Sequence, residues 1–246
     1  MAEFEGIDEV IEECSEGLDE EAEGATEGAL QEEIAEAQEN VSKLGKVVDS
    51  LKSLEIPQIL KSFTKFIAKN AAMGCIFFGV NVLLKKLVGQ STGAQALECQ
   101  KKQKKIKAFS QVISDITNDS HIVAKWAKDK EKVQVDVGDG IIVPLPDLLS
   151  KFTSPMEQHV ETAYQVVKQL MKKDEGGKIS FIVPTLEQVN QVIDSAVAVT
   201  KTLQDIVTFV DDKKTDHPEL GTLEIKQSDV NKLKDDIKKV KEMPYA

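Results

Sequence analysis

The feature that most constrains this chain is an apolar stretch at residues 66–88, within a sequence in which 30% of the residues are charged. Residues 70–84 carry no charged side chain, and Asn70 and Asn81 are the only breaks in the apolar surface. A helix that is apolar around its whole circumference either forms the centre of a bundle or enters a membrane. The rest of the chain must therefore cover this segment, or a bilayer must.

Length separates the two possibilities only in part. The uncharged residues 70–84 would form a helix about 22 Å long, which is shorter than the roughly 30 Å hydrocarbon core of a bilayer. This stretch alone would not be read as a permanent transmembrane span. Residues 66–88 together would reach about 34 Å, and Lys69, Lys85 and Lys86 lie near the ends, where long side chains can extend to lipid headgroups.

Two sets of residues in this stretch have distinct expected roles. Small side chains recur at every fourth position and would allow close helix packing, in lipid or in a tight core: Ala71, Cys75 and Gly79. The large apolar side chains would contact lipid if the segment inserts: Phe66, Ile67, Met73, Ile76, Phe77, Phe78, Val80, Val82, Leu83 and Leu84. Both a bundle core and a conditionally inserted segment fit these residues.

The surrounding pattern predicts long α-helices. One apolar stripe has alternating spacings of four and three, which place its members on one helical face: Leu30, Ile34, Ala37, Val41, Leu44, Val48 and Leu51. Pro57 ends or kinks this helix. A further helix is expected at about residues 94–130, interrupted at residues 118–120. Another helix is expected from Ser154, as N-cap with Glu157 closing a capping box, to Gly176-Gly177. Further helices are expected from Thr185, capped with Gln188, to about Val210, and over 230–240.

Strand signals are short and few. Val133, Val135 and Val137 alternate with polar residues and lead through Gly138-Asp139-Gly140 to an apolar run, which predicts a β-hairpin at 133–145. Residues 178–183 and 222–226 are weaker strand candidates. The expected fold is mainly α: an elongated helical bundle of four to five long helices with a small β-hairpin.

Charge is distributed unevenly along the chain. Residues 1–40 hold 16 Asp and Glu and no Lys, whereas residues 41–246 hold 26 Asp and Glu against 31 Lys. The sequence thus suggests an acidic N-terminal arm at 1–40 and a mildly basic body at 41–246. The arm either folds back on the body or remains a solvated tail.

Every basic residue is lysine, and one basic run lies near the start of the 94–130 helix. Its lysines are candidates for contact with lipid headgroups, with the acidic arm or with solvent alone: Lys101, Lys102, Lys104 and Lys105. The chain has no arginine, which is the residue that grips phosphates and base edges through a bidentate fork. Nucleic acid is therefore not an expected partner.

No pattern indicates catalysis or a cofactor. The three histidines have no metal-ligand spacing, and Gly138-Asp139-Gly140 lacks the remaining residues of a nucleotide-binding loop. Three cysteines at unrelated spacings predict no disulfide framework. We expect a protein that is not an enzyme and that carries no metal or cofactor. The acidic N-terminus is unlike a secretory signal, which predicts synthesis in the cytoplasm as a soluble protein.

The combination of heptad-patterned helices, one predominantly apolar segment, a small β-hairpin and no catalytic motif resembles the α-helical pore-forming toxins of the cytolysin A and haemolysin BL type. The resemblance covers residues 30–246 and concerns architecture only. It implies a soluble monomer that hides its apolar element, inserts it at a target-cell membrane and assembles there into a homo-oligomer. A cell-surface receptor is a further partner compatible with that class. The lack of a secretion signal and the acidic arm depart from it.

The residues also allow a second hypothesis. In it the chain is a non-enzymatic structural or partner-binding protein, and residues 66–88 are simply its central helix.

Overall fold

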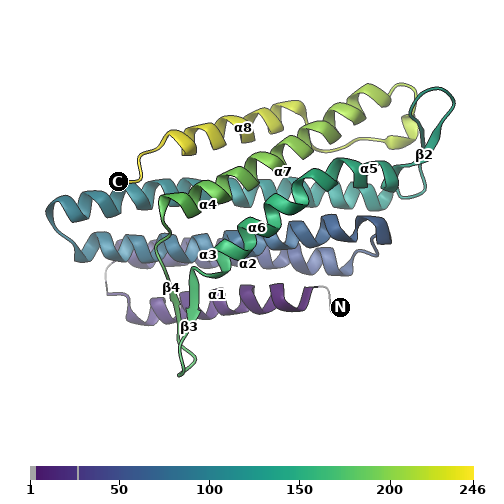
Figure 1. Ribbon diagram of the computed structural model, residues 1–246. Coiled ribbons are helices and arrows are strands. Elements are labelled where there is room, and N and C mark those ends of the chain that lie inside the picture. The colour runs from purple at the N-terminus through teal and green to yellow at the C-terminus, as the bar shows by residue number, and fades with distance from the viewer. Residues whose placement is uncertain (1–3, 27) are drawn as a thin grey trace.

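The computed structural model describes residues 4–26 and 28–246, and it is an elongated bundle of long helices lying side by side (Figure 1). The first four helices run back and forth in chain order: α1 (Glu5–Gly24), α2 (Gly28–Ser53), α3 (Lys61–Gln90) and α4 (Gly93–Asp129). A short 3-10 turn, η2 (Gln58–Leu60), precedes α3. The mainly α fold expected from the sequence is confirmed.

Helix α3 occupies the centre of this bundle. It packs along α2 and α4 over most of its length and also meets α1 and α6 (Glu157–Lys168). Nearly all of its residues from Phe63 to Leu84 are buried. A helix without a polar face needs neighbours on every side, and the surrounding amphipathic helices supply them.

The stripe predicted on α2 is the face that meets α3. Ile34, Ala37, Val41, Leu44, Val48 and Leu51 are all buried there, and Leu30 is partly buried. The helix ends at Ser53, four residues before Pro57. Local periodicity was sufficient to predict the buried face of α2, because the residues that form the apolar stripe are also the ones that pack against α3.

The interruption predicted at residues 118–120 is wrong. Helix α4 runs unbroken for 37 residues. Ser120 is buried inside it, and the hydroxyl of Thr117 donates to the carbonyl oxygen of Ile113 at 2.8 Å. Packing of the flanking apolar residues outweighs the turn preference of Asn118 and Asp119, since tertiary contacts override weak local propensity.

The second half of the chain adds two small hairpins and shorter helices. Antiparallel β1 (Gln134–Asp136) and β2 (Ile142–Pro144) form the predicted hairpin, with Val135 opposite Val143. Helix α5 (Leu145–Thr153), which the sequence analysis missed, continues through the 3-10 turn η3 (Ser154–Met156) into α6. Ser154 is therefore not a helix cap, and α6 ends at Lys168 rather than at the glycine pair.

A second hairpin pairs β3 (Met171–Lys173) with β4 (Ile179–Phe181), so the strand candidate at 178–183 is confirmed. Helix α7 (Leu186–Lys213) begins with the expected capping box, in which Thr185 and Gln188 bond reciprocally. After the 3-10 turn η4 (Pro218–Leu220), residues 222–226 form no strand. Leu223 and Ile225 are buried there, and α8 (Gln227–Glu242) follows.

The acidic N-terminal segment is part of the bundle. Helix α1 buries Ile7, Val10, Cys14 and Leu18 against α2 and α3, and its acidic side chains lie around that stripe. The boundary suggested at residue 40 falls within α2, which is one continuous helix. Net charge described the exposed positions of these helices and gave no information about their buried ones.

Candidate functional site around helix α3

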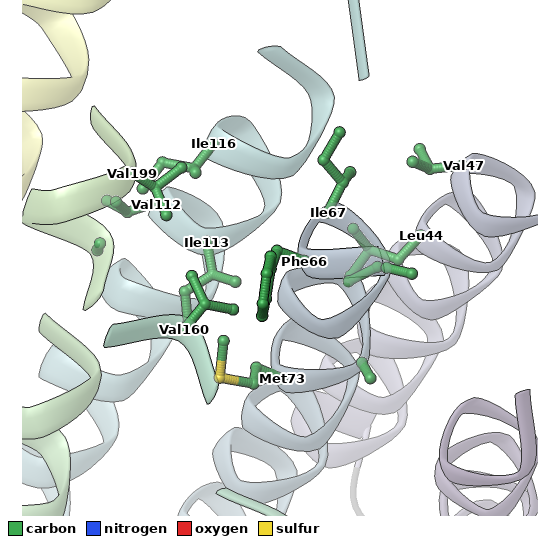
Figure 2. Packing of buried hydrophobic residues seen from close by; sticks show 14 of the residues in the cluster. Leu44, Val47, Phe66, Ile67, Met73, Val112, Ile113, Ile116, Val160 and Val199 are labelled. Carbon is green, nitrogen blue, oxygen red and sulfur yellow. The ribbon is translucent and has the colours of Figure 1, made fainter. Parts of the chain in front are cut away.

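The residues predicted to contact lipid line the centre of the protein. All of them are buried except Leu83, which is half-buried. Figure 2 shows Phe66, Ile67 and Met73 of α3 surrounded by apolar side chains from four other helices: Leu44 and Val47 of α2, Val112, Ile113 and Ile116 of α4, Val160 of α6 and Val199 of α7. The described form therefore encloses the segment that the sequence singled out.

The small residues of α3 permit close contacts, as expected, but with partners that the sequence did not reveal. Ala71 and Cys75 are fully buried. A Cβ added at Gly79 would lie 2.3 Å from the ring of Phe181 on β4. Gly74, which was not singled out, approaches the side chains of Leu44 and Ile113 in the same way. A glycine within an uncharged helix is the signal that could have identified it.

The β3–β4 hairpin forms a cover over α3 and α1. Phe181 lies between two glycines, because a Cβ at Gly17 of α1 would come within 3.1 Å of the other edge of its ring. The thiol of Cys14 on α1 donates to the sulfur of Met171 on β3 at 3.5 Å. The hairpin thus joins α1 to the central helix by contacts on both of its strands.

A polar network is buried beside this cover. Asn81 of α3 donates its amide to the carboxylate of Glu33 on α2 at 2.6 Å and accepts from the amide of Gln103 on α4 at 2.9 Å. Lys107 completes the network through Glu33 at 3.0 Å and Glu36 at 3.4 Å. Although burial opposes the charge, the two carboxylates raise the pKa of Lys107.

The lysines at the ends of the apolar stretch find acidic partners on other elements. Lys69 is 8% exposed, forms an ion pair with Glu161 of α6, and lies over the rings of Phe66 and Tyr164 at 5.0 and 5.5 Å from their centroids. Its hydrogen bond holds the pKa of Glu161 below the ordinary value. Lys86 pairs with Glu21 of α1 at 3.1 Å, and Lys85 is half-buried. Helix α3 itself contains no acidic residue.

The lysines in the basic run of α4 lie in different environments. Lys101 and Lys104 are exposed, and Lys102 pairs with Glu98 at 2.9 Å and lies over the ring of Tyr245. Lys105 was a candidate for contact with headgroups, the acidic arm or solvent, but it is buried and donates to the carbonyl oxygens of Lys241 and Met243 at the end of α8. Burial lowers its pKa. In this form Lys105 is not available to a membrane surface.

Helix α1 is held by lysines from three different elements. Asp8 pairs with Lys52 of α2 at 2.5 Å, Glu13 with Lys173 of β3 at 3.6 Å, and Glu21 with Lys86 of α3. Together with the apolar stripe, these pairs define the seat of α1. The acidic segment therefore has specific partners rather than a diffuse attraction to the body.

Nothing in the described part of the chain resembles a metal centre, because no three His, Cys, Asp or Glu side chains gather there. All three cysteines are free thiols. Burial raises the pKa of Cys14 and of Cys75. At Cys14, the neighbouring Cys75 and Glu13 raise the pKa further. These two thiols are therefore neutral and poorly nucleophilic.

Comparisons with protein-family models, with curated proteins and with solved structures found no match for this chain. Among the described residues, one helical stretch, Gln58–Gln90, is long and apolar enough to cross a membrane, and 72% of its most apolar window is buried.

Proposed function

We propose that this chain is a membrane-active, pore-forming helical protein whose central helix α3 is the inserting element. One observation supports this more than any other: α3 is a helix of 30 residues without a carboxylate, enclosed by helices that are separately amphipathic. At about 1.5 Å per residue it is about 45 Å long, longer than a bilayer core. In water its apolar surface must pack against other helices, whereas in lipid it can contact the acyl chains directly.

The charged contacts of α3 are compatible with its release. Its lysines at positions 69 and 86 pair with carboxylates that belong to α6 and α1, so those acids stay behind when α3 leaves. The freed lysines then face anionic headgroups, where each contributes about 1 kcal/mol. Insertion also requires the β3–β4 hairpin to lift, because Phe181 lies against Gly79. The inserted copies assemble into a homo-oligomer.

Leakage from dye-loaded vesicles, over a range of pH and lipid composition, tests this proposal. The sharpest variant is Met171→Cys, because the sulfur of Met171 contacts the thiol of Cys14 and a disulfide there would fasten the hairpin to α1. The oxidised variant should release no dye, and reduction should restore release. The double variant Cys14→Ser, Met171→Cys is the control and should respond to neither treatment.

A second test separates folding from insertion. Leu83 is half-buried, so Leu83→Asp should leave the soluble bundle folded but abolish leakage, since a carboxylate in α3 opposes its transfer into lipid. Ile142→Asp introduces the same group at an exposed site on β2 and should leave leakage unchanged. Absence of leakage by the unmodified protein under every condition would overturn the proposal.

The alternative function is that of a non-enzymatic structural or partner-binding protein with α3 as its permanent core. The buried network of Asn81, Glu33 and Gln103 favours it, because such polar contacts fix the register of packed helices. They would also have to be broken on insertion. This alternative predicts that α3 stays protected from amide exchange when vesicles are added, whereas the pore proposal predicts loss of protection in α1 and the β3–β4 hairpin.

A further inference from the structure

A groove lies between α7 and α8. These two helices lie at the edge of the bundle opposite to α1 (Figure 1). Its volume is about 480 Å³. Val197, which is 47% exposed, forms its floor with Thr200 and Ile237. Its rim carries four exposed lysines: Lys201, Lys234, Lys238 and Lys241. No carboxylate lines it.

The apolar floor and the lysine rim indicate which kind of segment could bind in the groove. Two helices with an apolar floor between them accept the apolar face of a third helix, which is a common mode of peptide recognition. The lysine rim adds a preference for negative charge on both flanks of that helix. An acidic amphipathic helix therefore fits the groove, and a basic or uncharged one does not.

Helix α1 has this composition. Ile7, Ile11, Cys14 and Leu18 follow one another at helical spacing, and residues 5–24 contain no basic side chain. Acidic residues recur four apart on α1, as at Glu9 and Glu13 or Glu12 and Glu16, and such pairs repel one another in a helix. Helix α1 therefore depends on surrounding lysines. Its own seat supplies three, and the groove rim offers four, of which Lys201 already pairs with Asp205 at 3.0 Å.

The α1 of the same copy cannot occupy the groove. Helix α1 ends at Gly24 and α2 begins at Gly28, and the body of the bundle separates α1 from α8 (Figure 1). The occupant must come from a second molecule. We propose that the α7–α8 groove receives α1 of a second copy once departure of α3 has dismantled α1's own seat. This inference rests on the proposed function, since in the closed form α1 is engaged.

A peptide of residues 4–24, labelled with a fluorophore, tests the groove without any membrane. Titrated with the full-length protein at low ionic strength, it should bind, and its anisotropy should rise. The triple variant Lys234→Glu, Lys238→Glu, Lys241→Glu should weaken binding at least tenfold. The matched control reverses three exposed lysines elsewhere, Lys132→Glu, Lys151→Glu and Lys172→Glu, and should bind as the unmodified protein does.

Two further measurements distinguish docking from general charge attraction. Val197→Asp keeps every lysine and should also weaken binding, because the floor must bury the peptide's apolar face. A peptide of the same composition in scrambled order should bind less tightly. The proposal is overturned if the α1 peptide does not bind, if the scrambled peptide binds equally, or if Val197→Asp has no effect. This test detects peptide binding rather than vesicle leakage, so its failure leaves the proposed function separately testable.

Discussion

The amide of Asn81 and the carboxylate of Glu33 are 2.6 Å apart in a region of α3 that is otherwise apolar. Both residues are buried, and each has a second partner, Gln103 for Asn81 and Lys107 for Glu33. The contact therefore joins α2, α3 and α4 through one side chain of the central helix.

Replacement of Asn81 should destabilise the soluble form. Asn81→Leu removes a donor and an acceptor at once, and the amide of Gln103 is left buried without its partner. We expect the free energy of unfolding to fall by about 1–3 kcal/mol, measured by urea denaturation. Asn190→Leu, at an exposed position of α7, is the control and should change it by less than about 0.5 kcal/mol. Equal effects of the two substitutions would contradict a role for the network.

Gly79→Ala should displace the β3–β4 hairpin, because the new methyl group would overlap the ring of Phe181. Overpacking of this kind costs about 1–3 kcal/mol. The double variant Gly79→Ala, Phe181→Ala should be no less stable than Phe181→Ala alone, since the ring that causes the overlap is absent. Gly24→Ala has open space around it and provides the control. Thermal or chemical denaturation of the unmodified protein and these four variants would reveal the coupling, and additive losses would disprove it.

Lys105→Met should loosen the end of α8. The substitution keeps the apolar stem but removes the ammonium that bonds to the carbonyl oxygens of Lys241 and Met243. We expect faster hydrogen exchange at the Met243 amide, whose bond to Val240 closes the last turn, by about tenfold or more, as loss of about 1.4 kcal/mol would produce. Exchange in α2 should be unchanged. Uniform acceleration throughout the chain would indicate a global loss instead.

Asp119 should make stability depend on pH. Burial, together with Asp229 of α8 and Asp115 of α4, raises its pKa to about 6, against the opposing effect of Lys232. Between its ordinary value of 3.8 and about 6, the folded state binds more protons than the unfolded state, so the free energy of unfolding falls as pH rises.

Asp119→Asn should therefore be more stable than the unmodified protein at pH 7, with the difference shrinking as pH falls to about 4. Urea denaturation across this range measures it. Burial lowers the pKa of His121 in both proteins, so the difference between them isolates Asp119. Asp216→Asn, at an exposed position after α7, should show no such trend. A constant difference at every pH would refute the assignment.

Local patterns were sufficient in α2 and at the start of α7. The α2 stripe and the capping box of Thr185 and Gln188 follow from spacing and side-chain chemistry within a few residues. The continuity of α4 through Asn118 could not be predicted in this way, because its buried flanks decide it. The same holds for Lys105, whose partners are more than 130 residues away in the chain.

The sequence predicted which residues form the candidate site but not which residues surround them. The sequence identified residues 66–88 and the small side chains of α3, yet nothing local indicates that Phe181 covers Gly79 or that Glu161 pairs with Lys69. Helix α1 was obscured for a different reason. Its dense carboxylates suggested a solvated arm, although the four buried residues of its apolar stripe are spaced as a helix requires.

The position of Phe181 between Gly17 and Gly79 also has a consequence for how this protein can change over evolutionary time. A side chain at Gly79 would need a smaller residue at 181, and one at Gly17 would need smaller residues at both 181 and 179, because Ile179 lies 2.8 Å from a Cβ at that position. Conversely, a smaller residue at 181 would leave a space that a larger residue at 79 could fill. Three positions from three distant segments should therefore substitute together, as correlated columns, in any set of diverged relatives of this chain.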